Sequence, residues 1–115
     1  MEQLNRVELR GNVGSVRTQS SGGKKVSRIT LATNHAYKDK NGNPVIETTW
    51  HNVVAWEGKG ICDLDSLERG CGLYACGRIH CQKFVGQDEV ERTSYEILAS
   101  KLVRIDNDEP LQCEF

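Results

Sequence analysis

Apolar and polar residues alternate along most of the chain with a period of two, which is typical of half-buried β-strands. In the first such stretch, Asn5–Val16, Val7 and Leu9 fall on one face and charged residues fall on the other. Gly11 and Gly14 interrupt this stretch, as glycines do where a strand is bulged or sharply bent. The pattern therefore predicts a first strand that bends.

The same alternation returns four times: in Val26–Tyr37, Ile46–Trp56, Leu73–Phe84 and Thr93–Arg104. Segments rich in Gly, Ser, Asn and Asp lie between several of these stretches, and the segment SSGGKK (Ser20–Lys25) reads as a turn. The Asn41-Gly42 step is a strong hairpin signal. We therefore expect five strands.

The period changes between the third and fourth stretches. Ile61, Leu64 and Leu67 are spaced three apart, and Gly70 follows as a stop signal. This spacing predicts one short helix of at most about three turns.

Three strands, a short helix and two more strands predict an all-β fold, namely a five-stranded OB-fold barrel with the helix between strands three and four. Closure into a barrel also removes most exposed sheet edges. We assign residues 1–105 to this single domain and residues 106–115 to a short acidic C-terminal tail. An open five-stranded α+β sheet is the alternative.

Trp50 and Trp56 are the only tryptophans, and their spacing places both on one face of the third strand, opposite Val53 and Ala55. Along a flat strand they lie roughly 20 Å apart. They cannot hold one small ligand between them, but they could contact two groups along an extended polymer.

The fourth strand has one polar face that ends in an aromatic ring beside Lys83. This face carries Tyr74, Cys76, Arg78, His80, Gln82 and Phe84, and the opposite, core-like face carries Leu73, Ala75, Gly77, Ile79 and Cys81. Exposed rings with adjacent cations are typical of proteins that bind single-stranded nucleic acid. The alternative is that the aromatic residues are core residues. Tyr37, for example, has the parity of Ile29 and Leu31 and could end a core face.

Composition constrains the partner only weakly. The 115 residues carry a formal net charge of -1, so any nucleic-acid footprint depends on how the charges are distributed. Five cysteines, an odd number, and the lack of an apolar leader after Met1 argue against a secreted disulfide scaffold. No apolar run is long enough for a membrane span. We expect a soluble, reduced, intracellular domain.

Neither a metal site nor a catalytic site is expected. Cys71, Cys76, His80 and Cys81 are zinc-type ligands, but Cys76 and Cys81 point to opposite faces, and Cys76 and His80 lie about 13 Å apart along a strand. Zinc requires ligands that converge within about 2.3 Å of one point. No nucleophile–base arrangement is evident. The GGKK and EGKG segments lack phosphate-loop spacing. We therefore expect no catalytic residue, metal or other cofactor.

Several segments resemble the bacterial single-stranded DNA-binding protein family. They are NRVELRGNVG (Asn5–Gly14), ITLATNHAYKDKNG (Ile29–Gly42), TTWHNVVAWEGK (Thr48–Lys59), LERGCGLYACGRI (Leu67–Ile79) and QKFVGQD (Gln82–Asp88). The resemblance covers about Asn5–Ile105, in order and with few gaps.

The resemblance implies an OB-fold that binds single-stranded DNA without strong sequence preference and protects it in replication, recombination and repair, in the cytoplasm with the nucleoid. It also implies a homo-oligomer, most often a tetramer with a dimer as the alternative, and a subunit contact at His51. The stacking aromatic positions of the family fall on Tyr37, Trp50, Trp56 and Phe84. The basic positions fall on Arg6, Lys38, Lys40, Lys59, Arg69 and Lys83.

The sequence departs from the family at several charged positions. Asn52, His80 and Gln82 stand where basic residues are common, and Glu57 adds a negative charge, which predicts a depleted basic groove. The family usually carries a long Gly/Gln/Pro-rich linker before an acidic tip ending in Phe, whereas here DNDEPLQCEF follows the last strand directly. We interpret this segment as a short unstructured terminus, with partner recruitment through Phe115 as the alternative.

Two other binding functions remain open. One is an OB module of the primosomal replication protein N type, which the chain length and the segment ILASKLVRID favour but the tryptophans do not. The other is a protein-interaction OB domain with weak DNA binding, which the missing basic positions would suit.

Overall fold

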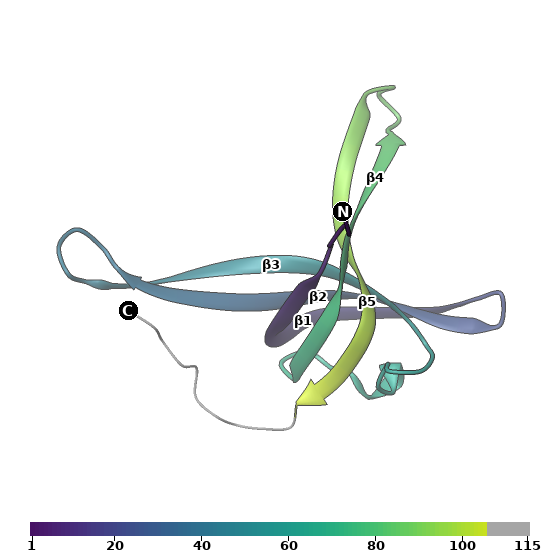
Figure 1. Ribbon diagram of the computed structural model, residues 1–115, viewed down its shortest axis with the longest axis horizontal. Coiled ribbons are helices and arrows are strands. Elements are labelled where there is room, and N and C mark those ends of the chain that lie inside the picture. The colour runs from purple at the N-terminus through teal and green to yellow at the C-terminus, as the bar shows by residue number, and fades with distance from the viewer. Residues whose placement is uncertain (106–115) are drawn as a thin grey trace.

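The computed structural model describes residues 1–105. Five strands make up most of this part: β1 (Val7–Ser21), β2 (Lys24–Lys38), β3 (Pro44–Trp56), β4 (Gly72–Val85) and β5 (Glu91–Ile105). They close into a barrel in the order β1-β2-β3-β5-β4 (Figure 1). Neighbouring strands run antiparallel, except that β3 pairs with β5 in parallel. The predicted five-stranded OB-fold barrel is confirmed.

The turn between β1 and β2 is tighter than the sequence suggested. Gly22 and Gly23 have φ angles of 61° and 84°, and strand pairing resumes at once between Ser21 and Lys24. Two successive positive φ angles define a type of hairpin turn that glycine adopts without strain. The first strand therefore runs on past its predicted end at Val16.

The predicted bend in β1 is present at Gly14. Val13 pairs with Leu31 on β2 and Ser15 pairs with Thr30, so Gly14 is the extra residue of a bulge. A bulge increases the local twist of a strand, which helps a small sheet to close on itself.

The core consists of the inward-facing residues of the strands together with two leucines from the β3–β4 connection. Its buried members are Val13, Ile29, Leu31, Val53, Ala55, Leu64, Leu67, Leu73, Ala75, Ile97 and Leu102. Every strand contributes at least one of them, and on β1 to β4 the buried members lie on the faces that the alternation indicated. On β5 a register shift at Ser100 changes the parity, so that both Ile97 and Leu102 reach the core.

The short helix predicted between the third and fourth strands is present, but it is shorter than the two to three turns allowed for it. Only Leu64–Ser66 is helical, as a single 3₁₀ turn named η1, and Ile61 instead forms a bridge with Leu102 on β5. Asp63 caps the start of this turn, because its carboxylate accepts a hydrogen bond from the backbone N–H of Asp65, and the turn ends where Leu67 takes an extended backbone conformation. A spacing of three matches the 3₁₀ period, which explains how Leu64 and Leu67 both reach the core.

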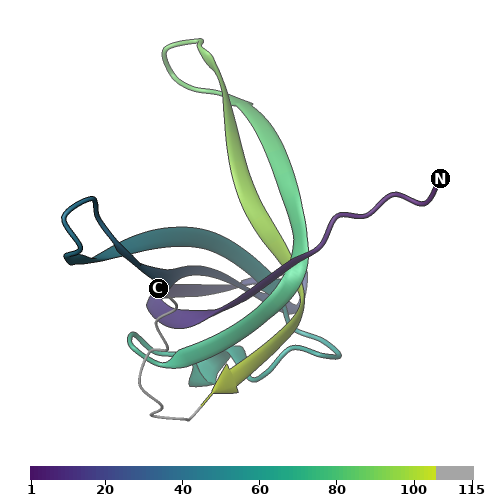
Figure 2. The same ribbon diagram turned by 60° about the vertical axis from the view of Figure 1, so that its left-hand side comes forward.

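The core-face assignment of Ile79 and Cys81 was wrong. Ile79 is 48% exposed and Cys81 is exposed, although both have the parity of the buried Leu73 and Ala75. The reason is that β4 and β5 continue beyond the barrel as a two-stranded arm, where the inner face of the strand no longer meets a core. Figures 1 and 2 show this arm and a second, separate arm formed by the β2–β3 hairpin.

None of the helical structure in residues 1–105 could cross a membrane, since it is far too short and not apolar enough.

Candidate nucleic-acid interface

The four aromatic side chains singled out from the sequence all lie exposed on the barrel and its arms. Tyr37 is 39% exposed, Trp50 61%, Trp56 45% and Phe84 45%. Exposure on this scale excludes the interpretation of these rings as core residues. They come from β2, β3 and β4, and they are the four aromatic positions that the family resemblance pointed to.

The two tryptophans share the outer face of β3, as their parity predicted. On the opposite face Val53 is 1% exposed and Ala55 is fully buried, which anchors the strand in the core. His51 is half-buried on this opposite face, and its Nε2 lies 2.8 Å from the hydroxyl of Thr33. The barrel therefore holds both indoles outward on a strand that is fixed from behind.

Trp50 lies against the backbone of β1. A Cβ atom added at Gly14 would stand 2.4 Å from Cζ3 of the indole, closer than atoms can approach. The bulge glycine therefore leaves the space that the ring occupies. Arg69, from the loop before β4, lines the same shallow depression as Trp50 and Gly14, so these predicted site residues do come together.

Tyr37 lies far along the β2–β3 arm. Its ring stacks with that of His35 at a centroid distance of 6.2 Å and an interplanar angle of 20°. The turn beyond it is held by Asp39, whose Oδ1 accepts hydrogen bonds of 2.9 Å from the backbone N–H groups of Asn41 and Asn43. The predicted residues Lys38 and Lys40 flank Asp39, and both side chains are exposed. The hydrogen bonds of Asp39 therefore hold the backbone from which these two lysines extend.

Phe84 lies on the β4–β5 arm, opposite Arg92 on β5. The neighbouring Lys83 is exposed, with its Nζ 4.0 Å from Glu91. Arg92 pairs with Asp88 at 2.6 Å. The arm thus presents one ring among charged groups, and it points away from the arm that carries Tyr37 (Figures 1 and 2).

Arg6 is already engaged by other side chains. Its guanidinium donates to Glu8 at 2.7 Å, and the same carboxylate accepts a 2.9 Å hydrogen bond from the hydroxyl of Tyr74. The bond from Arg6, with the help of Tyr74, lowers the pKa of Glu8, and the same pairing raises the pKa of Arg6. Because its charge is partly neutralised, Arg6 is less suited to binding phosphate than Lys59, which is exposed in the loop after β3.

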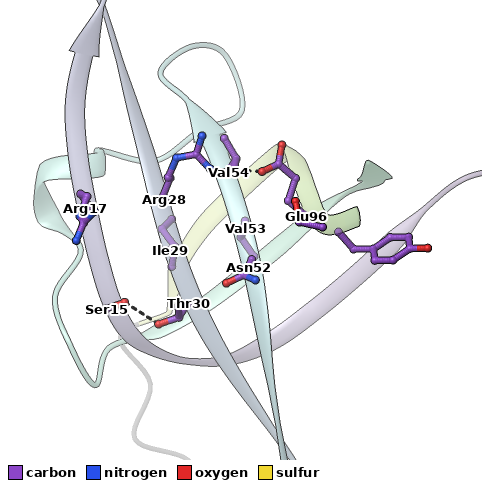
Figure 3. Close-up of a pocket in the computed structure, with 11 residues that line it drawn as sticks. Ser15, Arg17, Arg28, Ile29, Thr30, Asn52, Val53, Val54 and Glu96 are labelled. Atoms are coloured by element: carbon purple, nitrogen blue, oxygen red, sulfur yellow. Dashed lines mark hydrogen bonds and ion pairs between the residues drawn. The ribbon is translucent and has the colours of Figure 1, made fainter. Parts of the chain in front are cut away.

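A cleft lies over β3 in the interval between Trp50 and Trp56. We call it the inter-tryptophan cleft; its volume is about 280 Å³, and Figure 3 shows the residues that line it: Ser15, Arg17, Arg28, Ile29, Thr30, Asn52, Val53, Val54, Ser94, Tyr95 and Glu96. Sequence reasoning had not singled out Arg17, Arg28, Tyr95 or Glu96. The register places Arg28 of β2 opposite Val54 of β3. Arg28 therefore brings a positive charge close to Asn52, the neutral residue at a position where the family often has a basic one. Only the strand register, which parity does not give, could have revealed this.

Zinc-type ligands do not converge anywhere in residues 1–105. No group of three or more His, Cys, Asp or Glu side chains in that range is placed to hold a metal ion. Cys62, Cys71, Cys76 and Cys81 are free thiols.

Comparison with known sequences identifies related proteins. The model of the single-strand binding protein family matches residues 4–105. A single-stranded DNA-binding protein of Neisseria meningitidis (serogroup A) is 34% identical over 102 residues, covering 86% of this chain and 58% of the relative. One of Xylella fastidiosa is 37% identical over 101 residues, covering 86% and 62%. The chain therefore spans less than two thirds of the length of these relatives.

Two solved structures share the fold. Plasmodium falciparum SSB in complex with ssDNA superimposes with a TM-score of 0.79 at 28% identity, covering 92% of this chain and 98% of that one. A deletion mutant of the single-stranded DNA binding protein from Thermus aquaticus gives a TM-score of 0.73 at 19% identity, covering 91% and 52%. The second similarity shows the fold alone.

Proposed function

Because this chain belongs to the single-strand binding protein family, whose model matches residues 4–105, we propose that its barrel binds single-stranded DNA. The observation that carries the proposal is the exposure of Tyr37, Trp50, Trp56 and Phe84. Large exposed rings are unfavourable in water unless something covers them, and every base has a flat face that can do so.

The mechanism that we propose is stacking combined with phosphate contacts. Stacking contributes about 1–3 kcal/mol per base, and it tolerates any sequence because all bases present a π-face. Cations beside the rings would follow the DNA backbone. We assign this role to Lys38, Lys40, Lys59, Arg69 and Lys83, with a smaller contribution from Arg6 because Glu8 already holds it.

We further propose that the protein acts as a homo-oligomer, most readily a tetramer. His51 lies on the face of β3 opposite the tryptophans, and Ile79 of β4 lies near it. Ile79 is 48% exposed, so a second copy that packed there would cover apolar surface. Light scattering would measure the mass, and a monomer at all concentrations would contradict this assembly.

We place the protein in the cytoplasm with the nucleoid, where it would protect single strands during replication, recombination and repair. A role of residues 106–115 in recruiting partner proteins lies outside the described residues.

Titration of tryptophan fluorescence with oligo(dT) tests the proposed function directly. Both indoles lie at the proposed contact surface, so binding should quench their emission. No quenching and no binding at low salt would leave a protein-interaction domain as the better explanation.

A further inference from the structure

The inter-tryptophan cleft contains a carboxylate at a place where a polyanion is expected to pass. Glu96 projects from β5, and its side chain is only 10% exposed. Figure 3 shows Glu96 and Arg28 pointing toward each other at the cleft. A phosphate would be repelled by a carboxylate that little water can screen. The cleft is therefore better suited to a base edge than to the DNA backbone.

Glu96 keeps free capacity to accept hydrogen bonds. Its Oε2 lies 3.4 Å from Nη1 of Arg28, and its Oε1 lies 3.4 Å from Nδ1 of His80. The first contact is a long hydrogen bond, and both distances exceed the roughly 2.7–3.2 Å of a strong N–H···O bond. The His80 nitrogen is buried and has no hydrogen-bond partner within the described chain. An ionised carboxylate has about four acceptor positions, so donors from a ligand could bind here without displacing a strong interaction.

The order of these groups is acceptor, acceptor, donor: Oε1 and Oε2 of Glu96, then the guanidinium of Arg28. The complementary order is donor, donor, acceptor. Among the DNA bases only guanine has this order on its Watson–Crick edge, as the N2 amino group, N1–H and O6. In single-stranded DNA that edge is free to make hydrogen bonds.

The other bases match less well. Thymine has one donor between two carbonyl oxygens, so a carbonyl would face a carboxylate oxygen. Cytosine and adenine each place an amino group beside an unprotonated ring nitrogen, whose lone pair would face the second oxygen. Two acceptors that face each other in a buried site lose their hydrogen bonds to water and gain none in return, which costs binding free energy. A site of this kind therefore binds the wrong base more weakly.

We propose that the inter-tryptophan cleft binds the edge of one base and prefers guanine. Glu96 accepts hydrogen bonds from N1–H and the N2 amino group, and Arg28 donates to O6. The neighbouring bases stack on Trp50 and Trp56. This inference rests on the proposed binding of single-stranded DNA, to which it adds a local preference at one position along the strand.

Competition titrations with the full chain test the preference. The competitors are oligonucleotides of equal length in which isolated positions within a thymidine strand carry dG, dI or dA. Hypoxanthine, the base of dI, lacks only the N2 amino group, and adenine controls for purine stacking. The dG strand should bind at least about fivefold more tightly than the dA strand, with the dI strand between them.

Two variants assign the preference to the carboxylate. Glu96→Gln keeps the size of the side chain but replaces one acceptor by a donor, so the advantage of dG over dA and dI should disappear. Asp65→Asn removes a carboxylate that pairs with Lys25 outside the cleft, and it should keep the full advantage.

The outcomes separate the two proposals. If no oligonucleotide binds, the proposed function fails and the preference fails with it. If all strands bind equally, DNA binding stands and the guanine preference is overturned. If the dG strand still binds more tightly than the dA strand in Glu96→Gln, or if the dI and dG strands bind the wild type equally, the assignment to Glu96 is overturned.

Discussion

The indole of Trp50 lies so close to the backbone of Gly14 that a Cβ atom there would stand 2.4 Å from the ring. Gly14→Ala should therefore displace the indole and weaken oligo(dT) binding by on the order of 1 kcal/mol, with a modest loss of stability. Fluorescence titration and urea denaturation would measure the two effects.

A double-mutant cycle provides the control for Gly14→Ala. Trp50→Phe removes Cζ3 and Cη2, the two ring atoms nearest to the added methyl group. The stability cost of Gly14→Ala should then be smaller in the Trp50→Phe background than in the wild type. Equal costs in both backgrounds would show that the ring is not the group that the methyl group meets.

Removing either tryptophan should weaken DNA binding without unfolding the protein. Trp50→Ala and Trp56→Ala should each cost about 1–3 kcal/mol in oligo(dT) affinity, because each loses one stacked base. Val103→Ala is the control, since Val103 is also exposed, at 42%, but lies on β5 opposite Tyr74, which is not one of the four rings. If a variant kept both its melting temperature and its affinity for oligo(dT), that result would contradict a stacking role for the tryptophan that it lacks.

Salt dependence should distinguish the two arginines among the predicted basic residues. Arg69 is exposed beside Trp50, so Arg69→Ala should make the slope of log K against log salt shallower by about 0.7, as expected for one phosphate contact. Arg6→Ala should change the slope less, because Arg6 is paired with Glu8. Equal changes, or none for Arg69, would refute this ranking of the contacts.

Glu8 should make stability depend on pH in the acid range. Its pKa is lowered from 4.5 in the folded protein, mainly by Arg6, so its stabilising contribution is complete above pH 4.5 and is lost as pH falls through the lowered pKa. The difference in unfolding free energy between wild type and Glu8→Gln should narrow over that range. A constant difference down to the lowest pH reached would exclude this linkage.

The side chain of Asn5 pairs with the backbone of Ile79 as a neighbouring strand would. Its Nδ2 donates to the carbonyl of Ile79 and its Oδ1 accepts from the N–H of Ile79, both at 2.9 Å. Asn5→Asp keeps the acceptor but loses the donor, and should cost about 0.5–1.5 kcal/mol in unfolding free energy by urea titration. Gln3→Glu makes the same chemical change and should leave stability unchanged, since Gln3 is exposed before β1 begins.

Sequence reasoning placed the barrel strands and the outward tryptophans correctly because both depend on local alternation. It placed the short helix at Leu64–Ser66 but allowed it too many turns, since a spacing of three fits a 3₁₀ turn as well as a longer helix. It also misassigned Ile79, because parity says which side a residue faces but not whether a core lies on that side.

The sequence by itself determined the five alternating stretches, the glycine turn and the four aromatic positions. The tertiary structure alone decided that Arg28 and Glu96, which are 68 residues apart in the chain, form a hydrogen bond beside β3, the strand that carries both tryptophans. The physical reason is that side-chain parity is a property of one strand, whereas proximity across strands depends on register and on barrel closure, which the whole chain sets together.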